Sequence, residues 1–192
     1  MSEYHNTKAE DRVPLGQKLA VGAGGFPIQN GGLIVQYMAQ PIFQIFLGLN
    51  PALFGLAMTI PRIWDAFTDP VMGRISDRTQ SRYGRRRPYV FVGALAVALT
   101  FLTIWMVPQS MGDTGTFLWL TIGSVLFFTA FTVFSVPFNA LVYEQTPDYH
   151  ERTRLMFYLA LFYNIGNLCV NWYVPATNWS GFENPLVGAR WI

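Results

Sequence analysis

Long apolar stretches alternate with short polar segments along most of the chain. A helix that crosses the hydrocarbon core of a bilayer needs about 20 mostly apolar residues. Five stretches meet this requirement, at about 19–47, 51–76, 88–107, 116–143 and 155–175, and a sixth begins near residue 186. The pattern predicts an all-α membrane protein with five complete transmembrane helices and the start of a sixth. Residues 1–18 are polar, and we expect them to form a tail.

The composition supports a membrane protein and excludes several other classes. Only 12% of the 192 residues are charged and 52% are hydrophobic, whereas a soluble domain is about 25% charged. Disordered chains, collagen-like repeats and coiled coils have different compositions. A single cysteine excludes an internal disulfide and a cysteine-based zinc site. We therefore expect membrane lipids, and no nucleic acid, as partners, and no cofactor.

The basic residues predict how the helices are oriented. Eleven of the thirteen Lys and Arg residues lie in the tail or at the second-to-third and fourth-to-fifth connections. Cytoplasmic loops carry an excess of Lys and Arg. We expect a multi-pass protein of the cell membrane (inner or plasma membrane) whose N-terminus is cytoplasmic.

Three charged residues lie inside the second apolar stretch. Arg62, Asp65 and Asp69 are spaced by three and four residues, so they share one helical face. A carboxylate at the bilayer centre costs at least about 2.5–3.5 kcal/mol on insertion scales. Two readings remain open at this point: an internal ion pair with Arg62, or a site for a coupling cation. In the second reading Thr68 offers a further oxygen, and the ion is Na⁺ or H⁺.

Polar side chains recur at helical spacing in two other stretches. The first stretch carries Gln29, Asn30 and Tyr37, with further glutamines on the same face. In the fourth stretch the polar residues are Thr129, Thr132, Ser135, Asn139 and Tyr143. Such stripes either bind neighbouring helices or line a polar cavity, and we favour the cavity.

The connection between the second and third stretches contains the most specific motif. It reads G-R-I-S-D-R over 73–78 and G-R-R-R-P over 84–88. This resembles the loop motif between helices two and three of the major facilitator superfamily. Together with Asp65, Asp69 and the segment 137–154, it resembles the glycoside–pentoside–hexuronide:cation symporters, a family that includes the melibiose permease.

The charged residues around this motif are expected to form a cytoplasmic gate. Glycine permits close approach of helices, and acids can pair with nearby arginines, which also contact anionic headgroups. The predicted gate residues are Gly73, Asp77, Arg78, Arg85, Arg86, Glu144, Asp148 and Arg152.

The resemblance implies cation-coupled symport of a glycoside, pentoside or hexuronide by alternating access. It implies that Asp65 and Asp69 form the cation site, with Thr68 at a position often occupied by asparagine. The family's sugar-binding residue types are absent from the matching positions. Because helices one and four are equivalents in the inverted repeats of this superfamily, the expected substrate-binding residues are Gln29, Asn30, Tyr37, Ser135 and Asn139.

Two alternative functions belong to classes other than sugar symport. Intramembrane aspartyl proteases also bury two acids, but they use a G-x-G-D element that this sequence lacks, so we expect no enzyme. A carrier of a lipid-like or other non-sugar solute, or a transporter-derived sensor, stays open. Since a major facilitator transporter has twelve helices, we expect the C-terminal half of the transporter to be missing from this chain.

Overall fold

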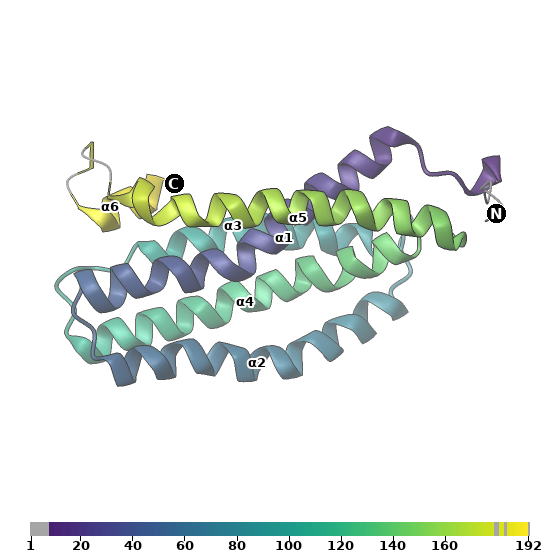
Figure 1. Ribbon diagram of the computed structural model, residues 1–192. Helices are drawn as coiled ribbons and strands as arrows, with labels where there is room; N and C mark the ends of the chain where they lie inside the picture. Colours follow the sequence, from purple (N-terminus) through teal and green to yellow (C-terminus); the bar gives the residue numbers. More distant parts are fainter. Residues whose placement is uncertain (1–7, 179–180, 183, 192) are drawn as a thin grey trace.

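The chain forms a bundle of long helices (Figure 1). The structure is a computed structural model and describes residues 8–178, 181–182 and 184–191; residues 1–7 of the expected tail lie outside the described part. The elements are η1 (Ala9–Asp11), α1 (Leu15–Ala39), the π-helical η2 (Gln40–Phe46), α2 (Pro51–Arg78), α3 (Arg87–Trp105), α4 (Asp113–Tyr143), α5 (Tyr149–Thr177) and α6 (Pro185–Trp191).

Each apolar stretch coincides with a helix, and local side chains determine where two of the helices begin. The Asn50 side chain accepts a hydrogen bond from the Ala52 N–H and thereby caps α2. The Asp148 side chain accepts from the Glu151 N–H and caps α5, which begins at Tyr149, six residues before the predicted start at 155. Similarly, α1 begins at Leu15, inside the segment 1–18 that was predicted to be a tail.

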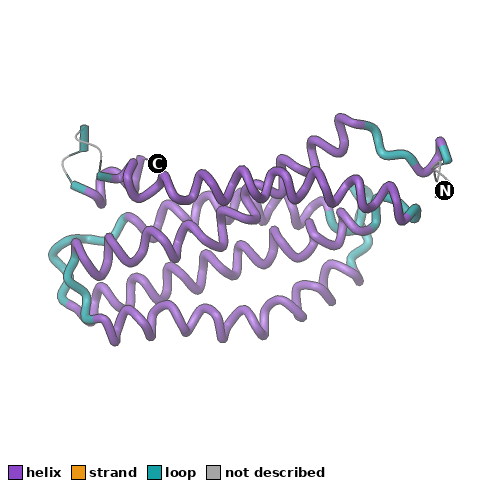
Figure 2. Tube along the Cα trace, viewed as in Figure 1, coloured by secondary structure: helices purple, strands orange, loops and turns teal. Residues whose placement is uncertain are grey.

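The helices run back and forth along the bundle. α1 packs along α5, and α4 packs along both α3 and α2. The start of α1, the α2–α3 connection and the α4–α5 connection all lie at one end, on the right in Figures 1 and 2. We call it the basic end, because eleven of the thirteen Lys and Arg residues lie in or beside these segments.

Two apolar clusters hold the bundle together. The larger lies toward the end opposite the basic end and includes the fully buried Phe43, Trp105 and Phe127. The smaller joins α1, α4 and α5 near the basic end. α6 is joined to the first cluster, and the Arg190 side chain donates to the carbonyl of Trp105 at 2.9 Å.

α3 and α4 approach each other closely at Gly93, whereas α2 has no such close approach at Gly73. A Cβ at Gly93 would lie 2.6 Å from the backbone nitrogen of Phe134, so only glycine allows α3 to lie this close to α4. A Cβ at Gly73 would meet only Val136, at an ordinary 3.9 Å. The close approach expected at Gly73 was therefore wrong.

Only α3 and α4, among the described helices, are apolar and long enough to span a membrane by composition alone, with mean hydropathy of 1.9 and 2.0. α2 falls short because it carries acidic and basic residues along its length. In α1 many of the positions are Gly, Gln or Asn, and α5 begins with charged residues and carries three asparagines. α4 keeps a strong signal although it also carries polar residues, among them the buried Ser124 and Thr132.

Candidate functional site

The acids of α2 face α4, and one carboxylate oxygen of Asp65 has no hydrogen-bond partner among the described residues. Asp65 is largely buried, its side chain being 18% exposed, and its Oδ2 lies 4.0 Å from Nη1 of Arg62. The Arg62 guanidinium also lies over the ring of Phe128, 4.8 Å from the centroid. Asp65 Oδ1 is buried and accepts no hydrogen bond from the described residues. The pairing with Arg62 therefore leaves one oxygen of this carboxylate without a partner. Burying a hydrogen-bond acceptor in this state costs free energy.

Asp69, one helical turn further along α2, receives a hydrogen bond from α4. The Thr132 hydroxyl donates to Asp69 Oδ1 at 2.7 Å, and nearby the Trp64 indole donates to the Thr129 hydroxyl at 2.9 Å. Thr132 was not among the predicted cation residues, although it belongs to the polar stripe of the fourth stretch. The contact between α2 and α4 brings it to the acid.

These groups together offer oxygen ligands only. They are the carboxylates of Asp65 and Asp69 and the hydroxyl of Thr132. Thr68 lies beside them, but its hydroxyl is directed to the carbonyls of Trp64 and Asp65, at 3.3 and 3.4 Å. Hard cations prefer oxygen ligands, and closely placed carboxylates also take up protons. The arrangement can therefore hold a small cation or a proton.

The predicted substrate residues divide into two groups. Asn30 is buried; it donates to the carbonyl of Phe26 and accepts from the Tyr173 hydroxyl at 3.4 Å. It therefore joins α1 to α5, as in the interhelical reading of the stripe. Asn139 donates to the Ser135 carbonyl of its own helix. Asn139 and three other predicted residues, Gln29, Tyr37 and Ser135, are at least partly accessible, and no hydrogen bond occupies the side chains of these three among the described residues.

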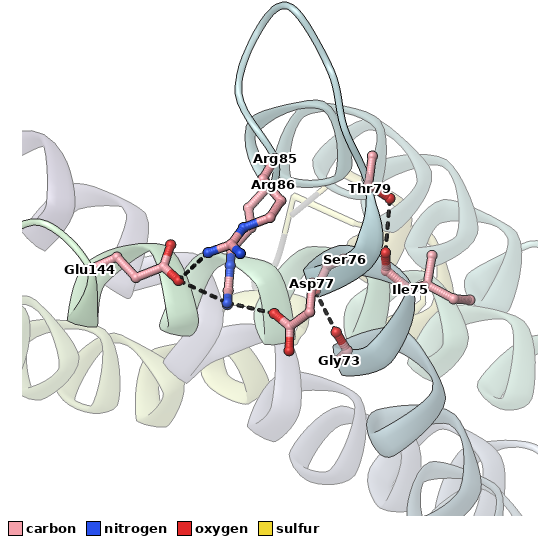
Figure 3. Close-up of polar contacts among 8 residues, drawn as sticks. All are labelled: Gly73, Ile75, Ser76, Asp77, Thr79, Arg85, Arg86 and Glu144. Carbon is pink, nitrogen blue, oxygen red and sulfur yellow. Dashed lines mark hydrogen bonds and ion pairs between the residues drawn. The ribbon is translucent and has the colours of Figure 1, made fainter.

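Four of the predicted gate residues form one ion-pair cluster at the basic end (Figure 3). Arg86 Nη2 lies 2.6 Å from Asp77 Oδ1 and 3.0 Å from Glu144 Oε1, and Arg85 Nη2 lies 2.7 Å from the same Glu144 oxygen. Asp77 is on α2 and Glu144 follows α4, so Arg86 connects these two helix ends to the start of α3. The side chain of Arg86 is only 10% exposed, which makes it the centre of the cluster.

The other gate residues have different contacts. Asp148 accepts from the Glu151 N–H at the start of α5. Arg152 donates to the carbonyl of Thr146 at 3.0 Å. Arg78 is exposed and forms no ion pair with the described residues. Neither Arg78 nor Arg152 forms an ion pair with the cluster around Arg86 among the described residues.

Glu151 is the charged residue that the sequence analysis missed. Its carboxylate is 1% exposed; it lies 2.6 Å from Lys18 and 3.3 Å from Arg154, and it accepts from the Val13 N–H at 3.0 Å. Burial acts to raise the pKa of Glu151, but the hydrogen bonds from Lys18, Val13 and Arg154 outweigh it and hold the pKa below its ordinary 4.5. We call Lys18 and Glu151 the α1–α5 pair.

Comparison with known proteins identifies the family. Residues 20–178 match the family described as MFS/sugar transport protein. The chain is 36% identical to an uncharacterized symporter of Synechocystis over 72% of its own length and 26% of the relative's. It is 32% identical to a sodium-dependent lysophosphatidylcholine symporter of Danio rerio, over 70% of the chain and 25% of the relative. A putative glycoside/cation symporter of Escherichia coli, YagG, is 27% identical over 90% of the chain and 35% of the relative.

These matches fit the helices described above. The chain spans about a quarter to a third of the length of these relatives. The family match together with the bundle of long helices confirms the predicted fold class, an N-terminal half of a major facilitator transporter. The relatives are named as symporters rather than as enzymes, in agreement with the prediction, and the family implies a multi-pass membrane protein. The chain therefore belongs to the MFS/sugar transport protein family of the major facilitator superfamily.

Proposed function

We propose that the complete protein is a symporter that couples solute uptake to a cation bound between Asp65, Asp69 and Thr132. The observation that carries this proposal is the buried Asp65 Oδ1 without a hydrogen-bond partner, one helical turn from an acid that already accepts from Thr132. A bound Na⁺ or H⁺ would satisfy this oxygen. The family match and the relatives' names support cation coupling.

The arrangement suggests how cation binding acts on the helices. The site lies at the contact between α2 and α4, so a bound cation would add to the hydrogen bonds of Thr132 and Trp64 that already join these two helices. The Arg86 cluster joins the same two helices at the basic end. We propose that the basic end is cytoplasmic in the cell membrane and that this cluster acts as a gate in alternating access, supported by the excess of basic residues there.

The substrate class that we propose is a sugar or sugar acid. The family description and the putative glycoside/cation symporter support it. Gln29, Tyr37 and Ser135 keep accessible side chains that can hydrogen-bond to hydroxyl groups. They would form one side of the substrate site, and the C-terminal half would supply the other.

A lysolipid is the second candidate. Several relatives at 29–32% identity are named sodium-dependent lysophosphatidylcholine symporters. The structure adds that two of the five predicted sugar contacts, Asn30 and Asn139, use their amides within or between helices. This reduces the number of groups available to a polyhydroxylated substrate.

One experiment separates the two classes. The full-length protein is reconstituted in vesicles, and uptake of labelled sugars, sugar acids and lysophosphatidylcholine is measured with and without a sodium or proton gradient. We expect gradient-dependent accumulation of a sugar or sugar acid. Accumulation of the lysolipid alone would replace the proposed substrate but keep the coupling. Uptake of every substrate without response to either gradient would overturn the coupling itself.

A further inference from the structure

The arginines of the α2–α3 connection divide into two sets. Arg85 and Arg86 point to Glu144 and Asp77, as Figure 3 shows. Arg82 and Arg87 are exposed, and neither forms an ion pair with the described residues. Gly84, between Arg82 and Arg85, has a φ of +99°, a conformation that favours glycine. The turn at this residue helps the short connection direct some arginines toward the bundle and leave others at the surface.

Arg82 and Arg87 both line a wide, open depression of about 870 Å³. Its lining residues are Arg82, Tyr83, Gly84, Arg87, Pro88, Phe91 and Val92. One end carries the two arginines, with the Arg82 guanidinium over the ring of Tyr83 at 4.7 Å. The other end is apolar. The depression thus changes from basic to hydrophobic along its length.

The apolar end lies on α3, whose outward-facing apolar residues are exposed. Phe91 and Val92 are 69% and 58% exposed. Only 17% of the most apolar 18 residues of α3 are buried within the bundle. An apolar helix with so little protein around it has lipid chains as its natural surroundings in a membrane. Arg87 is the first residue of α3, so the two arginines of the depression lie where the helix leaves the apolar region.

We propose that this depression binds one anionic phospholipid. The phosphate would lie between the guanidinium groups of Arg82 and Arg87, since arginine is well suited to phosphate. An acyl chain would follow Phe91 and Val92 down the surface of α3. The opposite charges of the arginines and the headgroup favour this occupant over a zwitterionic lipid. The site requires only that the protein lies in a membrane; it is independent of the coupling ion and of the transported solute.

The test measures lipid binding to the full-length protein in detergent by native mass spectrometry. Phosphatidylglycerol and phosphatidylcholine of equal chain length are titrated against the wild type, Arg82→Gln and Arg87→Gln. A basic side chain near a lipid surface contributes about 1 kcal/mol, so we expect each substitution to weaken phosphatidylglycerol binding about fivefold. Phosphatidylcholine binding is expected to change less than twofold.

Matched controls separate this site from general attraction to positive charge. Arg74 is an exposed arginine at the same end, outside the depression, and we expect Arg74→Gln to bind phosphatidylglycerol like the wild type. Phe91→Ser should weaken binding severalfold, while Leu168→Ser, at a position 70% exposed on α5, should not. An equal loss in Arg74→Gln and Arg87→Gln would overturn the proposal. Equal competition by soluble glycerol phosphate would overturn it too, because the lipid chain would then contribute nothing.

Discussion

The α1–α5 pair predicts a local loss of stability that can be measured directly. Lys18 and Glu151 lie 2.6 Å apart, with side chains 13% and 1% exposed. Replacing Glu151 by glutamine keeps an oxygen for the Val13 N–H but removes the charge opposite Lys18. A hydrogen bond to a charged group contributes about 1.5–3 kcal/mol, against 0.5–1.5 for a neutral one. The partly exposed Arg154 adds little, so we expect Glu151→Gln to cost about 2 kcal/mol.

This cost should appear in the segment that the pair holds. Hydrogen exchange of the full-length protein in detergent, followed by mass spectrometry, reports local opening of residues 13–20. A loss of about 2 kcal/mol corresponds to exchange about 30-fold faster in that segment. Glu10→Gln is the matched control, since Glu10 is 75% exposed and lies 3.9 Å from Lys8. We expect its effect to be within about 0.5 kcal/mol.

The result that would refute this reasoning is specific. If Glu151→Gln and Glu10→Gln both leave exchange of 13–20 within twofold of the wild type, the buried pair does not hold α1 against α5. Faster exchange throughout the bundle would mean that the variant unfolds globally, and the local interpretation would also be wrong.

Three further outcomes follow from single contacts. Gly93→Ala should lower the melting temperature, since its Cβ would lie 2.6 Å from the α4 backbone and overpacking costs about 1–3 kcal/mol; Gly55→Ala, which meets nothing within 4 Å, should leave it unchanged or raise it. Thr132→Val removes the donor to the acid of α2 and should raise the coupling-ion concentration for half-maximal uptake about tenfold, whereas Thr129→Val should not. Because the pKa of Glu151 is lowered in the folded protein, its stabilisation is present above pH 4.5 and lost as the pH falls below that value. The difference in melting temperature between wild type and Glu151→Gln should therefore be constant near neutral pH and shrink in acid.

The sequence was sufficient for the features that depend on one helix. Runs of about 20 apolar residues define spanning segments by length alone, and each coincides with a helix. Asp65 and Asp69 share a face because four residues make about one helical turn. Asn50 followed by proline predicts where α2 begins, and the structure places the start at Pro51.

Contacts between helices could not be obtained in this way. Asp148 and Glu151 have the spacing of a capping box, in which the glutamate side chain turns back to its own helix end. Here Glu151 instead reaches Lys18 and Val13 across the bundle. Asn30 belongs to a polar stripe, but which side of the stripe faces α5 depends on the rotation of α1 in the bundle. Spacing along one helix carries no information on that rotation.

The central claim is that the acids of α2 couple the cation to the solute. Its most direct test is accumulation of the transported solute in vesicles containing the full-length protein, driven by a gradient of Na⁺ or H⁺. We predict that Asp69→Asn inserts and folds but no longer accumulates solute, while Asp113→Asn, an exposed position at the opposite end of α4, behaves like the wild type. Accumulation by Asp69→Asn with unchanged dependence on the cation gradient would contradict the account.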